Sequence, residues 1–135
     1  MKIILKYLFT CCLLLSVCFC FSQQSKIDSL LTILKKDKPD PNKVIHFNTL
    51  CWEYINIGGY DTALQYGTAA LQLANAILSE AKNPTIKQAA QNSIATSYNN
   101  IGVVFMNQGN YDKALENHFA SLKILLQTSL NPDVS

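Results

Sequence analysis

Arginine is absent from this sequence, in which eleven lysines face nine acidic residues. Lys2 and Lys6 lie within the first 22 residues, so the rest of the chain carries equal numbers of both charges. Arginine is the usual bidentate ligand of phosphate and guanine, and a basic surface is needed to neutralise a nucleic-acid backbone. The composition therefore argues against nucleic acid as a partner.

Cysteine is nearly absent outside the N-terminal region, because four of the five cysteines occur before residue 21. The remaining one, Cys51, forms no internal disulfide or thiolate metal site, and its apolar helical setting predicts a small buried side chain. His46 and His118 have no cysteine or carboxylate set at metal-ligand spacing. We therefore expect no metal site, and we expect His118 to be a packed ring.

Residue patterns that would support catalysis are missing as well. Glu53, Glu80 and Glu116 are isolated in the sequence, and no Ser-His-Asp or paired-carboxylate arrangement can be recognised. We therefore expect that the chain is not an enzyme and that it needs no cofactor.

A long apolar run occurs only near the N-terminus, where fifteen residues from Tyr7 to Phe21 follow two lysines. The run is shorter than the roughly twenty residues that span a bilayer, and small residues precede Gln23. We interpret residues 1–22 as a signal peptide cleaved after Ser22, which predicts export to the periplasm or cell envelope. The alternatives are a retained membrane anchor and a lipoprotein modified at Cys18.

The remaining sequence has the periodicity of helices and no alternation typical of strands. Ile27, Leu30, Leu31 and Leu34 recur at helical spacing and predict an opening amphipathic helix within residues 23–39. Helix start and stop signals then predict two helix pairs, at residues 40–83 and 84–130, and a tail at 131–135. Helices are expected to start at Asp40-Pro41, at Asp61 as a capping residue and at Asn83-Pro84, and to end at Gly58-Gly59 and Gly109. The short connections predict an all-α fold of antiparallel neighbours.

Two similar segments, Tyr60-Asp-Thr-Ala63-Leu64 and Tyr111-Asp-Lys-Ala114-Leu115, lie 51 residues apart. Together with the residues before them they resemble the tetratricopeptide repeat, although the standard unit has about 34 residues. The resemblance implies packing roles for Leu50, Tyr54, Gly58, Tyr60 and Ala63 in the first pair, and for Tyr98, Ile101, Gly102, Phe105, Gly109, Tyr111 and Ala114 in the second. Cys51 and Gly67 depart from the family pattern, which usually has glycine and a large aromatic residue there.

In the tetratricopeptide family, the first helix of each pair lines a concave binding surface. The resemblance places these residues on it: Ile45, Asn48, Trp52, Ile55 and Asn56 from the first pair, and Thr96, Asn99, Val103, Met106 and Asn107 from the second. Apolar area combined with amides suits a protein or peptide partner of unknown identity. The alternative is that Trp52 covers a neighbouring helix while the amides face water.

The leader and the prolonged repeats together resemble the exported N-terminal region of Bacteroidetes-type sensor histidine kinases and cyclases. The resemblance implies a protein-interaction scaffold or, alternatively, the sensor or dimerisation region of a membrane-bound histidine kinase, cyclase or regulator. The last predicted helix carries more apolar residues than one antiparallel neighbour can cover, among them Leu115, Phe119, Leu122 and Leu125. We therefore expect either further repeats or self-association through this helix.

Overall fold

A computed structural model describes residues 24–130 of the chain as a row of helices. The predicted signal peptide and the tail at 131–135 lie outside the described residues. A helix at residues 24–34 is followed by α2 (Pro41–Asn56), α3 (Tyr60–Glu80), α4 (Pro84–Asn107) and α5 (Tyr111–Leu130). No strand occurs between residues 24 and 130, so the predicted all-α class is confirmed for this part of the chain.

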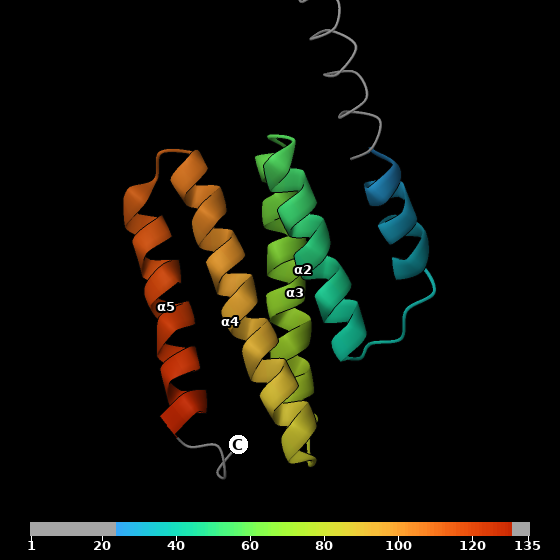
Figure 1. Ribbon diagram of the computed structural model, residues 1–135, viewed down its shortest axis with the longest axis vertical. Helices are drawn as coiled ribbons and strands as arrows, with labels where there is room; N and C mark the ends of the chain where they lie inside the picture. The colour runs from blue at the N-terminus through green and yellow to red at the C-terminus, as the bar shows by residue number, and fades with distance from the viewer. Residues whose placement is uncertain (1–23, 131–135) are drawn as a thin grey trace, which may run out of the picture.

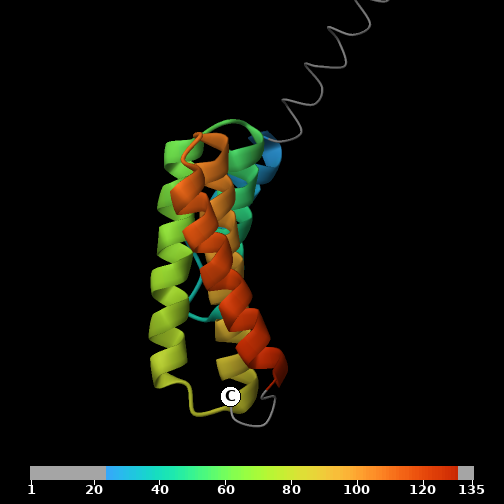
Figure 2. The same ribbon diagram turned by 90° about the vertical axis from the view of Figure 1, so that its left-hand side faces the viewer.

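The helices run up and down side by side, with the helix at residues 24–34 at one edge and α5 at the other (Figure 1). Consecutive helices from α2 to α5 pack against each other, and α2 also packs against α4. A quarter turn of the molecule shows α3 standing beside the layer that contains α2 and α4 (Figure 2). This order of contacts is that of a short helical solenoid.

Side-chain caps fix the starts of α2 and α4 where the sequence predicts them. Asp40 Oδ1 accepts hydrogen bonds from the backbone N–H groups of Asn42 and Lys43, at 2.8 and 3.2 Å. Asn83 Oδ1 accepts one from Thr85 N–H at 2.8 Å. In α3, by contrast, Gly59 occupies the N-cap position and Asp61 lies inside the first turn, where its carboxylate suits the helix dipole. The predicted capping role of Asp61 is therefore wrong.

Both helix pairs turn in the same way. Gly58 and Gly109 have φ of 76°, the left-handed conformation that glycine adopts without a steric penalty. Gly58 N–H donates to Ile55 O at 3.0 Å and Gly59 N–H to Tyr54 O at 2.8 Å. The second turn repeats both bonds 51 residues later, at 3.0 and 2.9 Å. These bonds satisfy the last carbonyl groups of α2 and α4 in the same geometry.

Cys51 and Gly67, which depart from the family pattern, face each other in the first pair. In the second pair the small and the large side chain are on the opposite helices. In the first pair, a Cβ atom added to Gly67 would lie 3.2 Å from Cys51 Sγ and 2.9 Å from Ile101 Cγ1 of α4. In the second pair the positions equivalent to Cys51 and Gly67 are Gly102 and His118, and a Cβ on Gly102 would lie 2.8 Å from the imidazole ring. The larger side chain has moved to the opposite helix, so His118 is the packed ring that the sequence predicts.

Most of the predicted packing residues take part in the core. Leu50 and Ala63 are inaccessible to solvent, Ile101, Gly102 and Ala114 are buried, and Tyr54, Tyr60, Tyr98 and Phe105 are partly buried. Tyr111 differs, because 71% of its surface is exposed. Its counterpart Tyr60 lies on α3, which packs against both α2 and α4, and the Tyr60 ring contacts a cluster that includes Val104 of α4. Of the helices α2 to α4, by contrast, only α4 packs against α5. The prediction that Tyr111 fills space within the repeat is therefore wrong for this chain.

Candidate functional site: a groove between three helices

A groove of about 390 Å³ opens where the helix at residues 24–34, α2 and α4 meet. Its lining residues follow helical spacing on each element, so each helix contributes one face. They are Lys26 from the first helix, Ile45, Asn48, Thr49, Trp52 and Glu53 from α2, and Ser93, Thr96 and Asn100 from α4. The volume lies near the lower end of the roughly 300–1,000 Å³ typical of ligand pockets, which suits a short segment of a partner.

The floor of the groove is a polar network between α2 and α4. Ser97 Oγ, which is inaccessible to solvent, lies 3.0 Å from Asn48 Oδ1. Asn48 Nδ2 donates to Ser93 O at 3.3 Å, and Asn100 Nδ2 donates to Asn48 O at 3.2 Å. Asn48 and Asn100 are each 6% exposed. Because these buried amides are hydrogen bonded to the neighbouring helix, the network fixes the register of α2 against α4.

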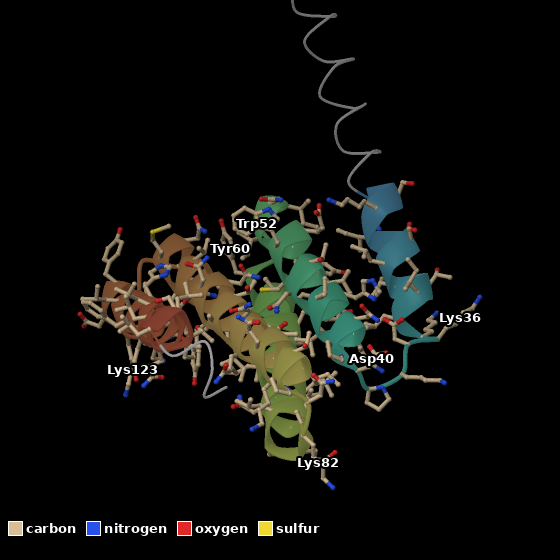
Figure 3. All side chains as sticks on the ribbon, turned by 60° about the horizontal axis from the view of Figure 1, so that its bottom comes forward. Lys36, Asp40, Trp52, Tyr60, Lys82 and Lys123 are labelled. Carbon is tan, nitrogen blue, oxygen red and sulfur yellow. The ribbon has the colours of Figure 1, made fainter. Side chains whose placement is uncertain are left out.

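The rim combines apolar area with hydroxyl groups. Ile45 and Trp52 lie about two turns apart on the same face of α2 and remain 53% and 45% exposed. Figure 3 shows Trp52 at the surface, far from Lys123 on α5. Thr49 Oγ1 donates to Ile45 O at 2.8 Å, and Thr96 Oγ1 donates to Asn92 O at 3.0 Å. Each hydroxyl thus uses its proton within its own helix and keeps oxygen lone pairs that can accept hydrogen bonds from a ligand.

An ion pair closes one side of the groove. Glu53 is only 5% exposed, and its Oε1 lies 2.5 Å from Lys26 Nζ of the first helix. His46 Nδ1 lies 2.6 Å from Asp37 Oδ2 and provides a second polar contact to the segment before α2. Ile27, which is 1% exposed, supplies the apolar part of this attachment. The first helix therefore forms a wall of the groove.

The structure separates the residues that the sequence placed on one concave surface. Asn48 and Trp52 line the groove, but Asn48 is part of its hydrogen-bonded floor. Ile55 is 8% exposed and belongs to a core cluster with Cys51, Ala63 and Val104, against which Val103 also packs. Asn56, Asn99, Met106 and Asn107 are exposed outside the groove, and Asn99 lines a separate hollow between α4 and α5. The placement of Ile55 and Val103 on the binding surface is therefore wrong, because both side chains pack in the core between α2, α3 and α4.

Five groove residues lie outside the surface that the sequence predicts: Lys26, Thr49, Glu53, Ser93 and Asn100. Lys26 and Glu53 are 27 residues apart and meet only because the first helix folds back along α2. Thr49 could have been found from the sequence, since it lies on the same helical face as Ile45 and Trp52.

The buried thiol of Cys51 does not belong to the groove. Cys51 is inaccessible to solvent and packs against Ala63 and Val104, as expected for a small core side chain. Burial raises the pKa of its thiol to about 12, so the thiol stays protonated near neutral pH. Among residues 24–130, no three histidine, cysteine or carboxylate side chains come together as metal ligands, and no helix is long and apolar enough to cross a membrane.

Comparison with known proteins yields no matching protein family, no matching curated protein and no matching solved structure. The resemblance to the tetratricopeptide repeat consequently rests on the sequence pattern and on the two equivalent helix pairs.

Proposed function

We propose that this chain is an exported, non-catalytic scaffold of the tetratricopeptide type that holds an extended segment of a partner protein. The observation that carries the proposal is the groove between residues 24–34, α2 and α4, in which an exposed tryptophan stands beside a rigid polar floor. Protein interfaces concentrate binding energy in such aromatic residues, and a fixed floor lowers the entropy lost on binding.

The polar groups of the groove favour a ligand that donates hydrogen bonds. Thr49 and Thr96 offer oxygen lone pairs on the rim, whereas the carboxylate of Glu53 is already paired with Lys26. An extended peptide presents backbone N–H groups and alternating side chains, so it can donate to these oxygens while one apolar side chain contacts Trp52.

The tetratricopeptide assignment is supported by the equivalence of the two helix pairs. Both pairs share the left-handed glycine, the paired backbone hydrogen bonds and a close contact between small and large side chains. Export is supported by the sequence of residues 1–22 alone.

Capture from an envelope extract tests the groove. Trp52→Ala removes the main apolar contact, and loss of a central tryptophan commonly costs about 2 kcal/mol, or roughly a thirtyfold loss of affinity. We expect any protein that the wild-type chain captures to be lost by Trp52→Ala, while circular dichroism shows unchanged helicity. A photo-crosslinking residue in place of Thr96 should label the same protein.

Two further variants define the extent of the surface. Ile86→Ala is a matched control, because Ile86 is 41% exposed on α4 but does not line the groove, and it should bind normally. Met106→Ala distinguishes the groove from the wider concave surface implied by the family resemblance, since binding confined to the groove would leave it unaffected. If Trp52→Ala folds and retains every partner of the wild-type chain, the proposal is refuted.

A second candidate function is the sensor or dimerisation region of a membrane-bound histidine kinase, cyclase or regulator. The observation that favours it is the exposed apolar face of α5, where Tyr111, Phe119 and Leu130 are at least 60% exposed. Cross-linking of intact cells would distinguish the two by whether a different protein is found in the complex. A different protein cross-linked at the groove favours the scaffold, whereas pairs of the same chain alone favour this candidate.

A further inference from the structure

Six large apolar side chains form one exposed stripe along α5. They are Tyr111, Leu115, Phe119, Leu122, Leu126 and Leu130, and each is at least 50% exposed. At about 100° per residue, these positions occupy an arc of about 100° on the helix surface. The buried Ala114 and Ser121, which face α4, lie about 120° around the helix from the centre of the stripe. The stripe is therefore open to a partner that does not touch α4.

The first helix pair shows what kind of element covers this face. Tyr60, Leu64 and Leu71 of α3 are equivalent to Tyr111, Leu115 and Leu122, and all three are packed against the core clusters. The equivalents of Phe119, Leu126 and Leu130 are the exposed polar residues Thr68, Asn75 and Ser79, so the apolar character of this half of the stripe is specific to α5. The next helix, α4, contributes Val104 and Ile94 to those clusters. A short connection makes α4 antiparallel to α3, so the element that suits the corresponding face of α5 is an antiparallel helix.

The stripe is complementary to itself in that orientation. The successive spacings of four, four, three, four and four residues read the same in both directions about a point between Ala120 and Ser121. When two α5 helices run antiparallel about a two-fold axis through this point, Phe119 of each copy lies beside Leu122 of the other. Leu115 of each copy then lies level with Leu126 of the other.

The charges beside the stripe favour the same arrangement. Glu116 and Lys123 lie seven residues apart on one flank of α5, and Lys123 projects from the outer helix in Figure 3. An antiparallel two-fold pair brings equal flanks together, so Glu116 of one copy lies about two residues, or about 3 Å, along the axis from Lys123 of the other. Two symmetric ion pairs result, which fix register and direction more than affinity.

We propose that α5 is a dimerisation helix, on which a second copy of this chain packs its own α5 antiparallel, with Phe119 against Leu122. The occupied face lies on a different helix from the groove, so the dimer presents two grooves. This inference does not depend on what the grooves bind.

Sedimentation of the full chain, purified from the cell fraction in which it accumulates, tests the dimer. We expect the mass to rise from one copy to two as concentration increases. Phe119→Lys and Leu122→Lys should remain monomeric over the same range, because each would bury an unpaired ammonium group at the contact. Ile86→Lys is the matched control, since Ile86 is similarly exposed on α4, and it should dimerise like the wild-type chain.

Disulfide formation tests the register without relying on lysine variants. When Leu115→Cys and Leu126→Cys chains are mixed under mild oxidation, an antiparallel pair should give the mixed disulfide in excess of either homodisulfide. A parallel pair would give the homodisulfides instead. The proposal is overturned if the wild-type chain stays monomeric at every concentration, if it grows beyond two copies, or if the homodisulfides prevail.

Discussion

Replacement of Gly102 by alanine probes a close contact between α4 and α5. The added Cβ atom would lie 2.8 Å from His118 Cε1 and 2.9 Å from His118 Nδ1, which is shorter than real contacts of a Cβ atom. Because of these short distances, the half-buried imidazole ring must move for the variant to fold in the same way.

Two opposing effects set the size of the change in stability. Overpacking of this kind costs roughly 1–3 kcal/mol, whereas alanine in place of glycine within a helix stabilises it by about 1 kcal/mol. The middle of that range gives a net destabilisation of about 1 kcal/mol in the wild-type chain. In a His118→Ala chain the ring is gone, so the same substitution should instead stabilise the fold by about 1 kcal/mol. The two changes should thus be coupled by about 2 kcal/mol.

Urea unfolding followed by circular dichroism, at one fixed protein concentration, measures all four chains of this cycle. Gly67→Ala is the matched control, because its Cβ would meet Ile101 and Cys51 rather than His118. It should destabilise both the wild-type and the His118→Ala chain by the same amount. If Gly102→Ala stabilises the wild-type chain as much as the His118→Ala chain, the close contact inferred here is absent.

Other predictions concern the buried thiol, the ion pair and the leader. Burial raises the pKa of Cys51 from 9.0 to about 12, so the folded chain should resist alkylation near pH 8, and equal labelling of folded and urea-unfolded chains would contradict this. The stability of the fold should fall as the pH rises from about 9 towards 12, because in this range the thiol loses its proton in the unfolded chain but keeps it in the folded one. Lys26→Met should lower stability by about 1–3 kcal/mol and by more than Glu53→Gln, because only the former leaves a buried carboxylate unpaired; equal unfolding midpoints would disprove the asymmetry. Mass spectrometry of the envelope fraction should find a chain that begins at Gln23, and an intact leader confined to the cytosol would refute export.

Local signals in the sequence were enough to predict which segments are helices and where the chain turns. Asp40 and Asn83 cap the helices that follow them, and Gly58 and Gly109 adopt the left-handed conformation. These features depend on the backbone of a few neighbouring residues, so their signals are local and can be recognised without knowledge of the fold. The equivalence of the two pairs could be recognised from the sequence because the repeated residues lie at the turns, where the signals are local.

The lining of the groove and the uncovered face of α5 depend instead on contacts between residues far apart in the sequence. Asn48 is bonded to residues 45 to 52 positions away, and Lys26 meets Glu53 across 27 positions. Ile55 has the same apolar character as Ile45, yet the packing of α2 buries the first and exposes the second. Periodicity identifies an apolar face, but the rotation of a helix about its axis is set by contacts with distant helices. Those contacts placed the groove on one side of α2 and left the stripe of α5 open.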